Sequence, residues 1–352
     1  MLWDAVLTIS FEQLVNSVLY VLLFENEIDF TNERRSEMEW NKPIGDLLPG
    51  DEVESFYLLK TAAARTTAAG KPFLSMTLAD RSGMIEAVVW DYAGPVGAAD
   101  EGNAIKIRGR VSEYRGALQM VVERIRLAAA EDQIDTSALV PTAPIDSAAA
   151  WDYVVNLISS LEDGDYAAVA QEMLRRHKDD FLRIPAAKSV HHSFVGGLLM
   201  HTANMLQVAD FLAEQYADTL DRSLLIAGTL LHDFAKMQEF TFSPLGLVTD
   251  YSTKGQLLGH LVMGAQEVAE IAKELGISEE KSVLLQHMIL SHHGEPEYGA
   301  AVRPQCAESE LLSLIDMIDS RMEIYRTALQ DVPVGAFSSR VFALEKKIYH
   351  HF

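Results

Sequence analysis

The placement of histidine constrains this chain more than any other feature of its sequence. Eight of its eleven histidines fall between residues 191 and 293, within segments that are otherwise rich in leucine and alanine. The stretch LLHDFAK, residues 230–236, sets His232 beside Asp233 in such surroundings. Burying two polar groups costs several kcal/mol unless each is paired or bound. We therefore expect a fold that gives these side chains a common partner.

Apolar residues recur at helical spacing along most of the chain after Trp151. The pattern runs through WDYVVNLISSLEDGDYAAVAQEMLRRH, HTANMLQVADFLAEQYA, RSLLIAGTLLHDFAK, HLVMGAQEVAEIAKELG, KSVLLQHMILSHHG and ESELLSLIDMIDSRMEIYRTAL. Spacings of three and four residues are typical of helices with one buried face. They predict an all-α helical domain over residues 151–352.

The histidines and aspartates follow an order that places each on or beside a separate helix. They are His201, His232 with Asp233, His260, His292 with His293, and then Asp316 or Asp319. Imidazoles and carboxylates are the usual ligands of Mn²⁺, Fe²⁺, Co²⁺ or Zn²⁺, and the absence of cysteine from this set argues against a structural zinc site. A single histidine on an apolar face is more often a core residue, but this ordered set predicts a metal centre.

The region before the helices has the texture of a β-protein. Two strand-like runs meet at the turn DRSG, two more meet at YRGAL, and an earlier run, EVESFYLLK, makes about five strands. This count and spacing predict a small antiparallel OB-type β-barrel over residues 38–130, a fold that often binds single-stranded nucleic acid.

The barrel is also the least acidic part of the chain. Residues 44–130 hold 10 basic and 11 acidic residues, a net charge of −1, whereas residues 151–352 hold 16 and 28, a net charge of −12. Aromatic and arginine side chains suggest a surface on which bases could stack; the alternative is that they are barrel core and ordinary solvated charge. The candidates are Phe73, Trp90, Arg108, Arg110, Tyr114 and Arg115.

The rest of the chain and its overall charge set broader bounds. Residues 1–37 read as an N-terminal extension of uncertain origin, with no basic residue ahead of its apolar run and with Glu12 inside it, which argues against a membrane span. Residues 131–150 read as a linker.

A formal net charge of −22 argues against coating nucleic acid by bulk electrostatics. The single cysteine, Cys306, is consistent with a cytoplasmic protein.

The order H…HD…H…HH…D resembles the HD superfamily of metal-dependent phosphohydrolases. The larger resemblance, over roughly residues 38–340, is to the YhaM-type 3′→5′ exoribonucleases, also called the CMP-binding-factor family, which join an OB domain to an HD domain. It is carried by GKPFLSMTLADRSGMIEAVVWD, HHSFVGGLLMHT, LLHDFAK, GHLVMG and MILSHHG. The sequence departs from the family after SHHG, where EPEYGAAVRPQCAESE lacks the expected Gly-Ser-Pro. It also lacks the Gly-Tyr-Pro of the related cyclic-dinucleotide phosphodiesterases.

The resemblance implies two divalent metal ions, a site suited to phosphodiester hydrolysis. One ion would be held by His201, His232, Asp233 and Asp316. The other would be held by His260, His292 and His293, with Asp233 bridging the pair. Such imidazole-rich sites favour Mn, Co or Fe over Mg.

Four further residues lie close to these motifs in the sequence. Lys236, one turn after His232, would reach a phosphate oxygen, the alternative being a solvated lysine. His191 and His192 would contact a ligand, contact the substrate, or only pack. His287 is expected to face elsewhere.

Three functions from different classes compete at this point. The favoured one is a metal-dependent 3′→5′ exoribonuclease or single-strand nuclease, with RNA or DNA as its partner and no membrane partner. The second is a phosphohydrolase of small nucleotides with a regulatory barrel, and the third is a nucleic-acid binding protein without activity. The choice of Asp316 or Asp319 as ligand, the native metal and a homo-oligomer stay open.

Overall fold

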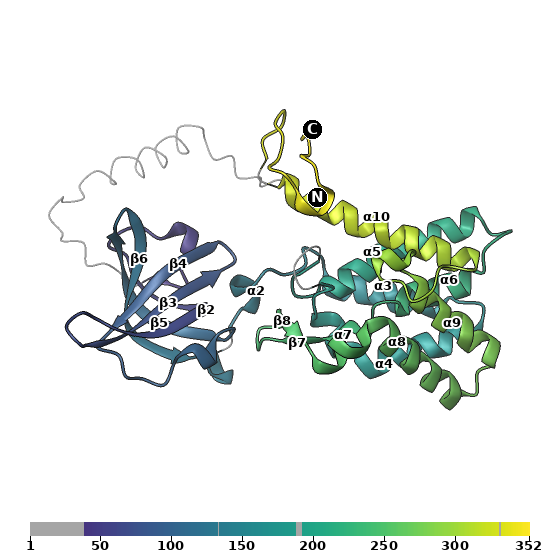
Figure 1. Cartoon of the computed structure of the whole chain (residues 1–352), viewed down its shortest axis with the longest axis horizontal. Helices are drawn as coiled ribbons and strands as arrows, with labels where there is room; N and C mark the ends of the chain where they lie inside the picture. Colours follow the sequence, from purple (N-terminus) through teal and green to yellow (C-terminus); the bar gives the residue numbers. More distant parts are fainter. Residues whose placement is uncertain (1–38, 133, 188–191, 331) are drawn as a thin grey trace, which may run out of the picture.

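The computed structural model describes residues 39–132, 134–187, 192–330 and 332–352. The predicted extension over residues 1–37 and the candidate His191 therefore lie outside the described residues. Figure 1 shows a β-barrel beside a helical domain, with the short helix α2 (Thr136–Leu139) between them.

Five strands form the barrel. They are β2 (Glu52–Thr66), β3 (Pro72–Asp80), β4 (Gly83–Trp90), β5 (Ala104–Tyr114) and β6 (Ala117–Leu127). A short strand, β1 (Glu39–Trp40), adds to β2 in parallel, and the sheet order is β1-β2-β3-β4-β6-β5. Strand β5 pairs back to β2, which closes the five-stranded barrel. Among the five barrel strands the β4–β6 pairing is parallel and the other pairings are antiparallel. The predicted OB-type fold is confirmed, as are its two turns, which join Asp80 to Gly83 and Tyr114 to Ala117.

Alternation of side chains explains why these strands close around a core. In β2 the residues at positions 53, 55, 57 and 59 are buried and their neighbours are at least partly exposed. Leu74, Met76 and Leu78 repeat the pattern in β3. Side chains two apart in a strand point to the same face, so each strand contributes one apolar row to the interior.

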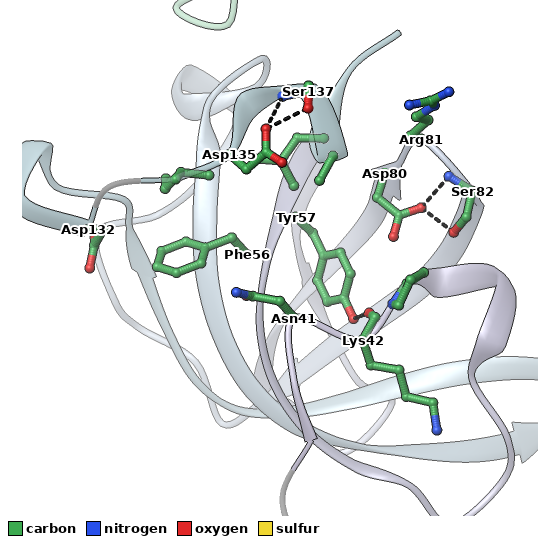
Figure 2. A pocket seen from close by; sticks show the side chains of 14 residues that line it. Asn41, Lys42, Phe56, Tyr57, Asp80, Arg81, Ser82, Asp132, Asp135 and Ser137 are labelled. Carbon is green, nitrogen blue, oxygen red and sulfur yellow. Dashed lines mark hydrogen bonds between the residues drawn. The ribbon is translucent and has the colours of Figure 1, made fainter. Parts of the chain in front are cut away.

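The connection to the helical domain is more ordered than a simple linker. After a 3-10 turn at Ala130–Asp132, Asp135 caps α2, and Asp146 caps α3 (Ser147–Ser159) by accepting two backbone N–H groups. A pocket of about 630 Å³ opens beside α2, where Phe56 and Tyr57 line it (Figure 2). The Tyr57 hydroxyl donates to the carbonyl of Lys42. None of the predicted metal ligands lines this pocket.

The second domain is helical, as predicted. After α3 its helices are α4 (Gly164–Arg183), α5 (Gly197–Gln215), α6 (Arg222–Leu231), α7 (Lys236–Glu239), α8 (Thr253–Leu275), α9 (Glu279–Ser291) and α10 (Ala307–Leu329). Every residue of α6 from Ser223 to Leu231 is buried, so this helix lies at the centre of the domain. Its C-terminal end places His232 and Asp233 inside the core. Among the described residues, no helix has both the length and the apolar character that a bilayer crossing requires.

A two-stranded hairpin in this domain is not predicted from the sequence. Strands β7 (Phe240–Phe242) and β8 (Val248–Tyr251) pair in antiparallel fashion between α7 and α8. Leu245 in its turn packs with Ala104 of the barrel and Leu139 of α2. The barrel therefore contacts a segment that begins one residue after Glu239.

Candidate metal centre

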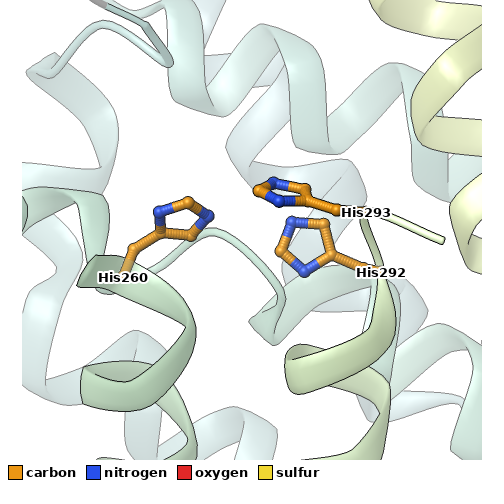
Figure 3. A group of neighbouring side chains, drawn as sticks. All are labelled: His260, His292 and His293. Atoms are coloured by element: carbon orange, nitrogen blue, oxygen red, sulfur yellow. The ribbon is translucent and has the colours of Figure 1, made fainter. Parts of the chain in front are cut away.

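The predicted ligands come together at the centre of the helical domain. His201 lies on α5, His260 on α8 and Asp316 on α10, while His232 and His292 cap the C-terminal ends of α6 and α9. Figure 3 shows His260 facing the pair formed by His292 and His293. Nitrogen or oxygen atoms of His201, His232 and Asp316 lie within 4.8 Å of one another, and those of His260, His292 and His293 do the same.

Asp233 lies between these two groups and turns one carboxylate oxygen to each. Its Oδ2 is 3.3 Å from His232 Nε2 and 3.7 Å from His201 Nε2. Its Oδ1 is 3.5 Å from His260 Nε2 and 3.7 Å from His292 Nε2. Two ligands that are about 2.1 Å from one ion at a tetrahedral angle lie about 3.4 Å apart. The spacings therefore suit a carboxylate that bridges two ions.

Buried atoms without a hydrogen-bond partner support the same interpretation. They include the Nε2 atoms of His232, His260 and His292, together with Asp233 Oδ1 and His293 Nδ1. Buried polar atoms are normally paired, and leaving one unpaired costs about 1–3 kcal/mol. Because the unpaired atoms are imidazole nitrogens and a carboxylate oxygen that face one another, the donor set fits divalent ions.

Four of the histidines are held in orientation by a hydrogen bond at Nδ1, the ring nitrogen that faces away from the centre. His232 Nδ1 donates to the Thr229 carbonyl at 2.7 Å, and His292 Nδ1 donates to the Ile289 carbonyl at 2.8 Å. Carbonyl and carboxylate oxygens only accept, so these contacts leave Nε2 as the nitrogen with a free lone pair. The other two histidines, His201 and His260, have carboxylate partners instead.

Asp319 is the carboxylate partner of His201. Its Oδ2 accepts from His201 Nδ1 and from His192 Nε2, both at 2.7 Å, and its Oδ1 accepts from Asn204 at 3.1 Å. Asp316 instead lies with its Oδ1 3.4 Å from His201 Nε2, on the ligand side of the ring. This geometry favours Asp316 over Asp319 as the ligand.

His192 contacts Asp319 and is not itself one of the predicted metal ligands. It is buried, with a left-handed backbone (φ of 47°) that is unusual for a residue with a side chain. Such a conformation persists only where surrounding contacts hold it, and here the bond to Asp319 is one of them. His287 faces elsewhere, as expected, since its Nε2 accepts the backbone N–H of Gln305.

Glu239 is the carboxylate partner of His260 and is not among the residues predicted from the sequence. Both of its carboxylate oxygens lie 3.1 Å from His260 Nδ1. Two glycines make this contact possible. A Cβ at Gly255 would lie 2.1 Å from the Glu239 carbonyl, and Gly259 has a φ of 71°, which breaks the helix immediately before His260. Glu239 follows His232 at helical spacing, but only the fold shows its contact with His260.

The ionisable groups in the centre shift one another's pKa values. Burial alone would raise the pKa of Asp233, but Lys236 and His232 outweigh it and keep that pKa well below its usual value. Burial and the nearby His232 lower the pKa of His292, and burial with His260 lowers that of His293. For His292, His293 and Asp233 these are the protonation states that metal binding requires. His232 differs, because burial would lower the pKa of its imidazole but Asp233 outweighs burial and raises it, so an ion bound at Nε2 would displace a proton.

Lys236 contacts the carboxylate of Asp233 and is largely shielded from solvent. Its Nζ donates to Asp233 Oδ2 at 2.6 Å, and this carboxylate outweighs burial and raises the pKa of the ammonium group. The alternative of a purely solvated lysine is therefore wrong. Its predicted contact with a phosphate stays a prediction.

The candidate nucleic-acid residues fall into separate parts of the barrel. Phe73 and Trp90 are cross-strand neighbours with ring centroids 5.1 Å apart. Tyr114 and Arg115 lie at the β5–β6 turn, with the guanidinium 5.2 Å from the ring centroid. Strands β4 and β6 run in the same direction, with Val88 paired to Val121. By this register Trp90 lies level with position 123 of β6, which is six residues from the start of β6 at the turn. At about 3.3 Å per residue, the two aromatic sites are about 20 Å apart.

A groove on the barrel places the predicted Arg108 beside three cations that are not predicted from the sequence, Lys106, Arg124 and Arg126. Arg108 pairs across the sheet with Arg124, and Lys106 pairs with Arg126. All four line a groove of about 600 Å³. Like charges directly opposite one another are unfavourable, and acidic neighbours offset most of them. Lys106 pairs with Glu54, Arg108 with Glu123 and Arg126 with Asp132. Arg110 points outward from β5 two residues beyond Arg108.

Family models match both domains. The model for the HD domain matches residues 198–321, which include all of the predicted metal ligands. The model described as an OB-fold nucleic acid binding domain matches residues 62–128.

Curated relatives match most of the chain. The protein named "3′-5′ exoribonuclease YhaM" of Listeria monocytogenes serotype 4b (strain CLIP80459) is 36% identical over 315 residues, covering 88% of this chain and 98% of the relative. The protein of the same name from Bacillus subtilis (strain 168) is 35% identical, covering 86% and 95%. That from Halalkalibacterium halodurans is 37% identical, covering 86% and 93%. Both domains therefore lie within the similarity.

Proposed function

This chain belongs to the family of YhaM 3′-5′ exoribonucleases, and we propose that it shortens single-stranded RNA from the 3′ end with two metal ions held in the helical domain. One observation carries the two-ion part of this proposal: Asp233 turns a separate carboxylate oxygen to each of two histidine groups. The relatives' name supports the polarity and the choice of RNA.

The proposed ligand sets divide the buried donors between two ions. His201, His232 and Asp316 would hold the first. His260, His292 and His293 would hold the second, and Asp233 would bridge the two. When bound, such ions lower the pKa of a bound water and stabilise charge on phosphate oxygens. Manganese, cobalt or iron suits this imidazole-rich set better than magnesium.

The side chains around the ligands have their own tasks. Asp319 and Glu239 orient His201 and His260 through Nδ1, so that Nε2 of each ring faces the centre. Lys236 keeps Asp233 ionised. The Lys236 side chain is 13% exposed, so its ammonium group would also be accessible to an anionic phosphate.

The barrel would bind the RNA strand that the helical domain cleaves. Trp90, half exposed, offers a stacking surface, and Arg108 and Arg124 offer cations for the backbone. Stacking contributes about 1–3 kcal/mol per base and needs no particular sequence. Tyr114 and Arg115 would contact a more distant part of a long strand. A cytoplasmic location stays a prediction.

A single degradation assay tests this function. Metal-loaded full-length protein is incubated with single-stranded RNA and DNA of one sequence, labelled at the 5′ or the 3′ end, and the products are separated by length. We expect 5′-labelled RNA to give a progressively shortened ladder and 3′-labelled RNA to release its label at once. Asp233→Asn serves as the inactive control.

Other outcomes favour the competing functions. Release of the 5′ label first would reverse the proposed polarity, and equal rates on DNA would make the protein a general single-strand nuclease. Intact RNA together with hydrolysis of mononucleotides would favour a small-nucleotide phosphohydrolase. No hydrolysis by metal-loaded protein would leave a binding protein.

A further inference from the structure

Helix α10 has two faces, and only one of them is occupied by the metal centre. Asp316 and Asp319 point inward from it. On the opposite face Leu314, Ile318 and Met322 are 47%, 49% and 53% exposed, and Met317 beside them is 40% exposed. In Figure 1 this helix lies along an outer edge of the helical domain. A helix that is apolar on its outer face as well is normally covered by something else.

A shallow apolar groove continues the exposed face. It has a volume of about 220 Å³, and Leu311 and Leu314 of α10 line it together with Tyr216 and Leu220. The residues that the structure describes leave both the groove and the stripe open to solvent. The surface therefore combines a ridge of side chains with a hollow beside it.

The order of side chains along this face is close to self-complementary. Leu314 and Met322 lie four residues before and four residues after Ile318. We propose that two copies of this chain associate through α10, antiparallel, about a two-fold axis at Ile318. The two Ile318 side chains would then meet at the axis, and Leu314 of each copy would lie level with the partner's Met322. A two-fold interface of this kind uses the same patch on both copies.

Charge complementarity supports a second copy over other occupants. Arg321 and Glu310 are exposed on the same flank of α10, and within the described part of the chain neither forms an ion pair. In an antiparallel pair centred on Ile318, Arg321 is three residues beyond the axis and the partner's Glu310 is eight. The two positions are separated by five residues, or about 7.5 Å along the helix, which an arginine side chain can span. Because of the two-fold symmetry, the ion pair between Arg321 and Glu310 would form twice in each dimer.

The association does not depend on the proposed catalysis, since none of these outward residues belongs to the metal centre. It has a structural consequence nonetheless, because α10 carries Asp316. A partner packed on its outer face would hold the helix from both sides.

Sedimentation velocity of the full chain over a range of protein concentrations, at physiological salt, tests the proposal. We expect a concentration-dependent dimer for the wild-type protein. Ile318→Glu places two like charges at the axis and should weaken dimerisation by at least about 30-fold. Val283→Glu, which adds the same charge at an exposed apolar residue of α9, is the matched control and should dimerise like the wild type.

Charge exchange then tests the antiparallel register. Arg321→Glu and Glu310→Arg should each weaken the dimer, and the double variant Arg321→Glu/Glu310→Arg should restore it. Circular dichroism and manganese binding should be unchanged in every variant. A wild-type chain that stays monomeric at all concentrations overturns the proposal and points to another cover for α10, such as residues 1–37. A dimer that survives Ile318→Glu, or a double variant weaker than both single ones, would also overturn it.

Discussion

Replacement of Glu239 by glutamine should weaken one metal site and spare the other. His260 Nδ1 lies 3.1 Å from both carboxylate oxygens, and the backbone N–H of His260 also donates to Oε1. An amide keeps the shape but offers one acceptor oxygen, so its NH₂ group must lie against the Nδ1–H of the ring. A hydrogen bond to a charged group is worth about 1.5–3 kcal/mol, which corresponds to about 10–160-fold in affinity.

The assay is calorimetric titration of chelator-stripped protein with Mn²⁺. Glu239→Gln should weaken the site of His260, and Asp319→Asn should weaken the site of His201 by a similar factor. The double variant should weaken both. Glu270→Gln, at an exposed glutamate of the same helix α8, is the control and should bind like the wild type.

Two results would refute this reasoning. If Glu239→Gln leaves both affinities within about twofold of the wild type, the carboxylate does not orient a ligand. If it weakens both sites equally, His201 and His260 do not serve separate ions.

Four further predictions follow from the same geometry. Asp233→Ala should lower activity more than Asp319→Ala, because Asp233 faces both histidine groups; equal losses in a rate assay would mean that it bridges nothing. After chelation Mn²⁺ should restore RNA hydrolysis better than Mg²⁺, and full activity in Mg²⁺ would contradict the ligand set. Trp90→Ala should weaken binding of a long strand by about 1–3 kcal/mol in a fluorescence titration while sparing hydrolysis of a small activated phosphodiester; equal losses on both would place Trp90 outside a strand-binding surface. Burial opposes ionisation of Glu267, but the hydrogen bond with His177 outweighs it and lowers the pKa below its ordinary 4.5. Stability from this carboxylate is therefore fully present above pH 4.5 and is lost as the pH falls through the lowered pKa. In urea unfolding Glu267→Gln should be less stable than the wild type at pH 6, the difference should shrink as the pH is lowered through the acidic range, and a constant difference would exclude the carboxylate.

The strands, the helices and the histidine order could be predicted because each leaves a local pattern. Alternation in β3 and the turn between Asp80 and Gly83 identify the hairpin by themselves. The burial of His232 follows from the apolar run that precedes it. These signals report which face of an element is covered, and they are visible within a few residues.

The partners inside the centre could not be predicted in the same way. Periodicity shows that Asp316 and Asp319 are nearly on one face of α10, but it does not show which nitrogen of His201 each one meets. The contact between Glu239 and His260 depends on the break at Gly259, which lies immediately before the predicted helical run that begins at His260 and leaves no periodic signal. The hairpin of β7 and β8 is too short to leave a periodic signal.

The central claim is that two ions act together across Asp233, and the most direct measurement is RNA hydrolysis as a function of bound manganese. Chelated protein is loaded with increasing Mn²⁺, bound metal is measured by mass spectrometry, and the rate on 5′-labelled RNA is followed in parallel. We expect the rate to stay low at one ion per chain and to reach its plateau at two. A plateau at one ion per chain, or a full rate without metal, would contradict the two-ion centre.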